Sequence, residues 1–158
     1  MKRRIVFLGA ALAWALPLVG YAAGADDPLH GTWQLNVAKS HFEPGPPPKG
    51  QLRTYRIVGD TERLTARGVS AEKKPTLVQY EARYDGKDYA ITGSTGGDRI
   101  SLARIDALTT QSTQKRDGKP AIITTRKVSS DGKTLMVTAK GTTAEGQKLD
   151  SVLHFDKR

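Results

Sequence analysis

Apolar and polar side chains alternate with a period of two residues along most of the chain after residue 25. In residues 78–84 (Val-Gln-Tyr-Glu-Ala-Arg-Tyr), the apolar and aromatic side chains share one phase and the polar side chains share the other. Residues 33–37 and 135–139 follow the same scheme. Such alternation is typical of antiparallel strands with one buried and one solvated face. No segment of this region has a convincing helical period, so the pattern predicts an all-β fold.

Turn signals divide this pattern at short intervals. The tripeptide Asp-Gly-Lys occurs at residues 85–87, 117–119 and 131–133, and Glu145-Gly146 continues the spacing of the last two. Asp-Gly favours two-residue hairpins of type I′, in which both central residues have positive φ. Together the breaks and the alternation predict ten strands, near residues 31–38, 51–58, 62–69, 76–84, 88–93, 98–105, 107–116, 120–129, 133–142 and 147–156.

Ten sequential strands in an open sheet would leave two exposed edges, which invite aggregation. Sheets of this size usually curl or close on themselves. We therefore expect an antiparallel up-and-down meander that closes as a barrel, with a two-sheet sandwich as the alternative. Residues 43–49 (Glu-Pro-Gly-Pro-Pro-Pro-Lys) interrupt the rhythm, because consecutive prolines form a stiff, extended segment. This segment either caps one end of the barrel or links two strands, and we favour the link.

The first 25 residues have the order of a cleavable signal peptide. A basic start (residues 1–4) precedes an apolar stretch (residues 5–20) and then small residues at cleavage spacing. Cleavage is expected before Asp26, or before Ala23 as second choice. The apolar stretch is shorter than the roughly 20 residues that span a bilayer. The sequence thus predicts a signal peptide at 1–25, a single domain at 26–158 with no membrane span, and a periplasmic or secreted location.

Composition narrows the possible functions. The chain has no cysteine, which excludes disulfides, thiolate metal sites and a cysteine nucleophile. Its formal net charge is +9, and the basic residues are scattered singly rather than in long runs. We interpret them as a solvated surface. Nucleic-acid binding is not expected, because export disfavours it and most aromatic residues fall on the apolar faces.

No assembled catalytic or metal-binding set is visible. The three histidines, His30, His41 and His154, lack the close spacing of metal ligands and are expected to be exposed. Gly93–Gly97 lacks the Lys-Ser/Thr and the helix of a phosphate-binding loop and is expected to be a hairpin loop. Acidic residues such as Asp60 and Glu62 fall at turns. We therefore expect a protein that is not an enzyme and that carries no cofactor and no metal.

Three stretches of sequence resemble a group of small exported bacterial proteins of uncharacterised function. They are Gly31-Thr32-Trp33-x-Leu35-Asn36, Lys39-Ser40-x-Phe42-x-Pro44-Gly45-Pro46, and Tyr84-Asp85-Gly86-Lys87-Asp88-Tyr89 with Thr92-Gly93. More faintly, the opening Gly-x-Trp strand and the meander resemble the calycins, which include the lipocalins and the fatty-acid-binding proteins. The resemblance implies a ten-stranded, lipocalin-like barrel. The Arg-x-Tyr pair by which fatty-acid-binding proteins hold a carboxylate is replaced by Leu153 and Phe155, and the helical lid is replaced by the proline-rich segment.

A ten-stranded barrel encloses more room than an eight-stranded one, whose interior side chains just fill. Few of the inward side chains are large, so the barrel either flattens or keeps a cavity. We expect a carrier of a small apolar molecule; the alternative is an exported inhibitor or an envelope protein that binds another envelope protein. The candidate ligand-binding residues are those predicted to point into the barrel: Trp33, Tyr55, Tyr80, Tyr84, Leu102, Val137 and Phe155.

Overall fold

A computed structural model describes residues 27–158, which form a closed, ten-stranded antiparallel barrel. The expected signal peptide and its cleavage sites lie outside the described residues. The strands are β1 (Gly31–His41), β2 (Gly50–Val58), β3 (Thr61–Val69), β4 (Pro75–Arg83), β5 (Tyr89–Thr92), β6 (Arg99–Arg104), β7 (Thr109–Arg116), β8 (Lys119–Val128), β9 (Thr134–Thr142) and β10 (Lys148–Lys157). Each lies within a few residues of a predicted strand.

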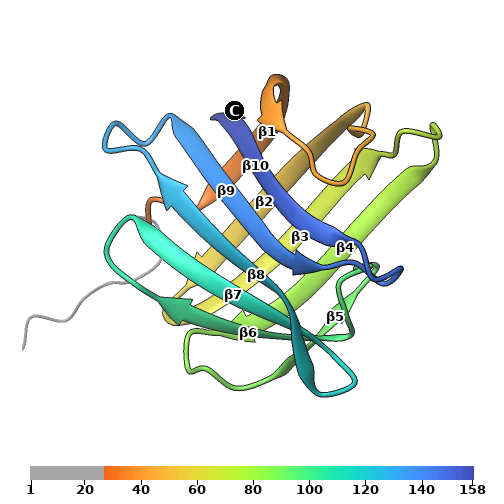
Figure 1. The fold of residues 1–158 in the computed structure, drawn as a ribbon. Coiled ribbons are helices and arrows are strands. Elements are labelled where there is room, and N and C mark those ends of the chain that lie inside the picture. Colours follow the sequence, from red (N-terminus) through yellow and green to blue (C-terminus); the bar gives the residue numbers. More distant parts are fainter. Residues whose placement is uncertain (1–26) are drawn as a thin grey trace, which may run out of the picture.

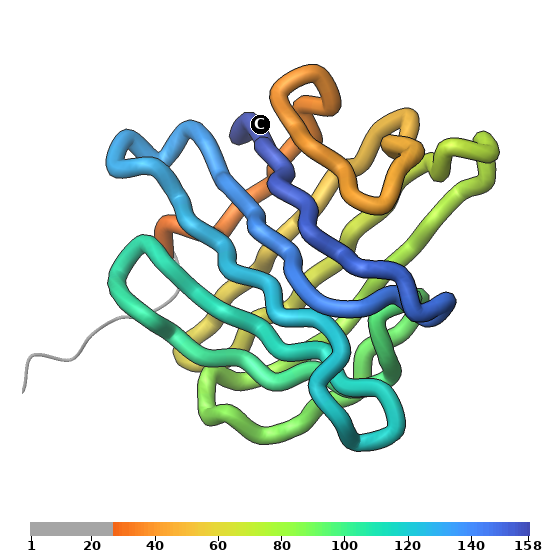
Figure 2. Tube along the Cα trace, in the orientation of Figure 1, coloured from red at the N-terminus to blue at the C-terminus, as the bar shows by residue number. Residues whose placement is uncertain are grey.

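Every strand pairs with its neighbours in sequence, and β1 also pairs with β10 (Figures 1 and 2). At this seam Leu35 of β1 lies opposite Phe155 of β10, and Trp33 lies opposite Lys157. Closure gives every strand a partner on both sides, although the short β5 pairs with β4 and with β6 at only two positions each, and so it reduces the edges at which other chains could add. The prediction of a closed up-and-down barrel is confirmed, and the sandwich alternative is wrong. Among residues 27–158, the structure contains no helix capable of crossing a membrane.

The hairpin turns agree only in part with the prediction of type I′ geometry. At Asp117-Gly118 both residues have positive φ, 51° and 73°, as a type I′ turn requires. At Asp131-Gly132 only the glycine does, at 70°. There the Gly132 amide donates to the Ser129 carbonyl and the Ser129 amide donates to the Thr134 carbonyl, which closes a longer loop. Asp-Gly suits this loop equally well, because a glycine there also takes the left-handed conformation.

The interior is filled unevenly along the barrel axis. One end, where the β2–β3, β6–β7 and β8–β9 turns lie, is packed with large buried side chains. They include Leu29, Trp33, Ile57, Leu102, Val128, Leu135 and Phe155. The opposite end, towards the right of Figure 1, gathers the β1–β2, β3–β4, β5–β6 and β9–β10 connections. The barrel therefore has a solid end and an open end.

Trp33 anchors the solid end. Its side chain is fully buried, and its indole N–H donates to the carbonyl oxygen of Leu29 at 2.9 Å. The Lys157 ammonium lies 5.0 Å from the ring centroid. A buried tryptophan needs such a partner for its N–H, so residues 27–30 complete the packing of this end.

Candidate functional site

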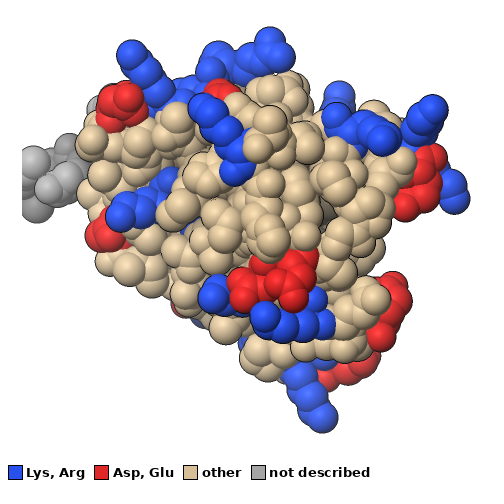
Figure 3. All heavy atoms as spheres, turned by 45° about the horizontal axis from the view of Figure 1, so that its top comes forward, with Lys and Arg blue, Asp and Glu red and all other residues tan. Residues whose placement is uncertain are grey.

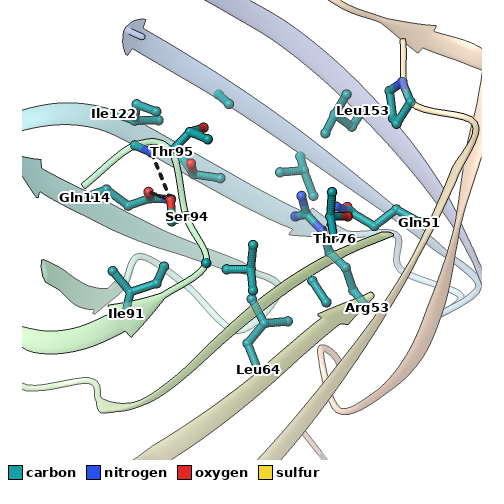
Figure 4. Close-up of a pocket in the computed structure, with 18 of the residues that line it drawn as sticks. Gln51, Arg53, Leu64, Thr76, Ile91, Ser94, Thr95, Gln114, Ile122 and Leu153 are labelled. Carbon is teal, nitrogen blue, oxygen red and sulfur yellow. Dashed lines mark hydrogen bonds between the residues drawn. The ribbon is translucent and has the colours of Figure 1, made fainter. Parts of the chain in front are cut away.

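The open end contains a cavity of about 450 Å³. Its walls are mixed. The apolar lining residues include Leu64, Val78, Ile91, Ile100, Ile122, Val137, Leu149 and Leu153, and the polar ones include Gln51, Thr76, Ser112, Gln114 and Thr124. Figure 4 shows side chains from opposite walls, including Leu64, Ile122 and Leu153, converging on this space. The volume lies within the roughly 300–1,000 Å³ of small-molecule pockets in proteins.

The mouth of the cavity is built from the connections between strands. The proline-rich segment contributes Pro46 and Pro48, so it also covers part of the open end instead of only linking β1 to β2 as we favoured. Gly93–Gly97 forms the β5–β6 loop, which confirms the predicted hairpin loop. In that loop the Ser94 hydroxyl donates to Gln114 Oε1 at 2.5 Å and accepts from the Gly96 amide at 3.0 Å (Figure 4).

Arg53 is a half-buried cation on the cavity wall. Its Nε donates to Gln51 Oε1 at 2.7 Å, and its guanidinium carbon lies 4.7 Å from the centroid of the Phe155 ring. Among residues 27–158, no carboxylate lies within ion-pair distance of Arg53. Its positive charge is therefore not compensated by a direct neighbour at this wall.

A buried ionic cluster lies where the cavity meets the solid end; we call it the floor cluster, and it consists of Glu62, Tyr80, Tyr84 and Arg126. The side chains of Arg126 and Glu62 are 2% and 0% exposed, and Nη1 of Arg126 donates to Glu62 Oε1. The Tyr80 hydroxyl donates to the same oxygen, and the Tyr84 hydroxyl donates to Glu62 Oε2. Nη1 of Arg126 also lies 2.9 Å from the Tyr80 hydroxyl oxygen, which accepts its hydrogen bond.

The strand register brings the floor cluster together. Glu62 is in phase with the inward residues Leu64 and Ala66 of β3, and Arg126 is in phase with Val128 of β8. On the neighbouring strand, Tyr80 lies directly opposite Leu64. Both charged side chains consequently point into the barrel, and the pair bridges strands that are far apart in sequence.

Burial sets the protonation of this cluster. Burial, reinforced by the nearby Glu62 carboxylate, raises the pKa values of Tyr80 and Tyr84 above their ordinary value, so both hydroxyls stay protonated donors. Burial alone would lower the pKa of Arg126, but the Glu62 charge together with the nearby hydroxyls of Tyr80, Tyr55 and Tyr84 outweighs burial, and the pKa is raised. A buried pair of this kind is tolerated when its charges compensate each other and further hydrogen bonds are made.

The candidate ligand-binding residues divide into three groups. Tyr55, Tyr80 and Val137 line the cavity, and their role in ligand binding stays a prediction. Tyr84 is half-buried in the floor cluster. The other three, Trp33, Leu102 and Phe155, are buried in the solid end and do not line the cavity. All seven therefore belong to the interior, but only three of them border the open space.

Sequence reasoning missed the two charged members of the floor cluster. Glu62 was interpreted as a turn residue, and that is wrong: it lies in β3 and is fully buried. A signal was present, since Glu62 and Arg126 each share the phase of inward apolar neighbours. The histidines also differ in part from expectation. His41 is exposed, whereas His154 is half-buried and His30 Nδ1 accepts from the Ile57 amide at 3.2 Å.

The outer surface carries its charges in a mixed pattern. On the face shown in Figure 3, lysine and arginine side chains stand singly or in small groups, with acidic side chains among them. Several form surface ion pairs, such as Lys148 with Asp150 at 3.4 Å. Exposed pairs of this kind contribute little to stability, which agrees with a solvated surface.

Comparison with known proteins supports the fold. No family model matches the sequence, and neither does any curated protein. Among solved structures, the zebrafish ileal bile acid-binding protein in complex with cholic acid is similar, with a TM-score of 0.54 and 15% sequence identity. The similarity covers 83% of this chain and 99% of that one. The chain thus shares its closed-barrel fold with that protein.

Proposed function

We propose that this protein is a non-enzymatic binding protein that holds one small, predominantly apolar molecule inside its barrel. The observation that carries the proposal is the uneven filling of the barrel, which leaves a cavity of about 450 Å³ at the open end, with many apolar side chains in its lining. A cavity lined by apolar groups with a few polar side chains is the usual form of a small-molecule site.

The side chains at the two ends explain why one end stays open. Trp33, Phe155 and large aliphatic residues fill the solid end, whereas the cavity lining includes several small side chains: Ala66, Thr76, Ser112, Thr124 and Ala139. The wall around them is a continuous ring of paired strands, which resists the collapse that would otherwise close the space. The cavity is thus part of the fold and does not depend on a mobile segment.

The similar solved structure is a bile acid-binding protein that holds cholic acid. Its architecture supports the idea of an internal ligand here, but 15% identity does not carry the ligand across. The residues at the Arg-x-Tyr positions of fatty-acid-binding proteins differ in this chain, since Leu153 lines the cavity and Phe155 packs in the solid end.

Ala139→Phe tests whether binding takes place in the cavity. Ala139 lines the cavity, so a phenyl group there would occupy space that a ligand needs. Ala103→Phe is the matched control, because Ala103 is exposed on the outside of β6. We expect the neutral dye Nile red to bind the wild type and the control with enhanced fluorescence, and to bind Ala139→Phe at least about tenfold more weakly.

Two results would count against an internal site. The first is that Nile red does not bind the folded wild-type protein at any dye concentration at which the dye stays monomeric. The second is that Ala139→Phe binds Nile red with the same affinity as the wild type and Ala103→Phe. Circular dichroism of all three proteins verifies that the barrel is folded.

We further propose that the protein works outside the cytoplasm after removal of residues 1–25. The order of basic, apolar and small residues in this segment supports cleavage. Mass spectrometry and N-terminal sequencing of the protein from its own cells should identify Asp26, or Ala23, as the first residue. A chain that retains Met1 would contradict export with cleavage.

A further inference from the structure

The floor cluster presents hydrogen-bond donors without presenting a net charge. Arg126 lines the cavity, and its charge is compensated by the Glu62 carboxylate in direct contact. Among the other charged residues that line the cavity, Arg53 has no acidic partner, and Glu72 lies at the mouth in the exposed β3–β4 connection. Positive charge that can attract an anion is therefore located at the wall beside Arg53 and not at the floor.

Two donors of the buried guanidinium have no hydrogen-bond partner among residues 27–158. Nη1 of Arg126 is used by Glu62 and Tyr80, whereas Nε and Nη2 make no hydrogen bond and are buried. The hydroxyl of Thr110, which lies directly opposite Arg126 on β7, is also buried without a partner. Buried polar groups are nearly always hydrogen-bonded in proteins, and leaving one unpaired is costly. No acceptor among residues 27–158 pairs with these atoms; the Tyr55 ring, a group of negative potential, has its centroid 5.4 Å from the guanidinium carbon.

The acceptor must be compatible with Glu62. A ligand carboxylate at the floor would place two negative charges around a single guanidinium in a buried environment. The two carboxylates would repel each other, and one guanidinium would not offset the cost of removing the second carboxylate from water. A carbonyl, ester or hydroxyl oxygen accepts the same hydrogen bonds without adding charge.

We propose that the floor of the cavity selects a ligand whose inner end is a neutral hydrogen-bond acceptor, bound by the free N–H groups of Arg126. This assignment rests on the proposed function, because it names the class of molecule that the cavity takes: an apolar ketone, ester or alcohol. An anionic group is accepted only at the wall, beside Arg53.

Three chain-length-matched probes distinguish these cases: methyl laurate (a neutral acceptor), tetradecane (no acceptor) and laurate (an anion). Their affinities are measured by displacement of Nile red from the wild type and from the double variant Glu62→Gln/Arg126→Met. That variant replaces the ion pair with neutral side chains of similar size, which buried pairs often tolerate. We expect the ratio of methyl laurate to tetradecane affinity to fall at least about tenfold in the double variant, as loss of hydrogen bonds from a charged donor implies. Comparing ratios cancels the different hydrophobicity of the probes.

Arg53→Met is the matched arginine control. It should lower laurate affinity and leave the methyl laurate to tetradecane ratio unchanged. A readout on the wild type alone covers the case in which the double variant does not fold. The nitrogen NMR resonance of Arg126 Nε should shift on addition of methyl laurate and stay in place on addition of tetradecane.

The outcomes separate the two proposals. Failure of all three probes to displace Nile red would overturn the proposed function itself. Two results would overturn the selection of a neutral acceptor and leave the binding function intact. One is an equal ratio of methyl laurate to tetradecane affinity in the wild type and the double variant. The other is an Arg126 Nε resonance that does not shift on addition of methyl laurate. Laurate binding that depends on the Glu62–Arg126 pair and not on Arg53 would overturn it as well.

Discussion

Replacing Trp33 with alanine tests whether the solid end holds the barrel together at its seam. The side chain is fully buried, and truncation of a buried large aromatic residue typically costs about 3–5 kcal/mol of unfolding free energy. Loss of the hydrogen bond to the Leu29 carbonyl, which leaves that acceptor without a partner, adds about 1 kcal/mol. The expected total of roughly 4–6 kcal/mol is a large part of the stability of a typical domain.

Thermal unfolding followed by far-ultraviolet circular dichroism measures this cost. For a domain of this size, 1 kcal/mol corresponds to about 3–4 °C in Tm, so Trp33→Ala should lower Tm by more than about 10 °C. Leu52→Ala is the control, since Leu52 on β2 is 37% exposed on the outer surface and should shift Tm by only a few degrees. If Trp33→Ala unfolds within a few degrees of the wild type, Trp33 does not anchor the seam.

Three further predictions follow from local geometry and protonation. A Cβ on Gly93 would lie 1.8 Å from the Leu77 carbonyl oxygen, whereas a Cβ on Gly86, which has the same φ of 72°, meets nothing within 4 Å. Gly93→Ala should therefore lower Tm far more than Gly86→Ala. Equal decreases in Tm would contradict the close approach of Gly93 to Leu77. Hydrogen bonds and nearby basic groups lower the pKa values of seven carboxyl groups, of which Asp150 is half-buried and the others are exposed: Asp60, Glu72, Asp85, Asp106, Asp131, Glu145 and Asp150. Their stabilising contribution is present above the unfolded-state pKa near 4 and is lost as the pH falls below it, so the denaturation midpoint should decrease below about pH 4; a midpoint that stays constant down to about pH 2 would contradict this. Burial raises the pKa values of Tyr80 and Tyr84, so the stability that these two residues contribute is present below the unfolded-state pKa near 10 and is lost as the pH rises above it. Both residues should ionise only as the barrel unfolds. Tyrosinate absorbance that reaches its full value before the barrel unfolds would refute this.

The strands could be predicted from sequence because two local signals coincide along the whole domain. Alternation fixes which residues face inward, and glycine-containing turns fix where each strand ends, as in the β8–β9 hairpin around Gly132. Closure followed because a ten-stranded meander has two edges, and the apolar faces of residues 33–37 and 149–155 could meet. The type of each hairpin turn was harder to predict from the sequence, because Asp-Gly fits both a two-residue loop and a longer one.

The site was harder to predict because it depends on distances around the barrel. Phase identifies Trp33 and Tyr55 alike as inward residues, but only the three-dimensional register shows that Trp33 belongs to the solid end and Tyr55 to the cavity. Glu62 and Arg126 looked like surface charges because each was considered alone. Their partnership is set by the curvature of the sheet, which brings β3 and β8 across the barrel from one another.

Native mass spectrometry of the protein isolated from the cells that make it tests the central claim most directly. A barrel that holds one apolar molecule should appear as the chain mass plus a single small-molecule mass, and the Ala139→Phe variant from the same cells should appear without it. A wild-type spectrum that contains only the bare chain, or an added mass that persists in Ala139→Phe, would contradict the account of an internal ligand site.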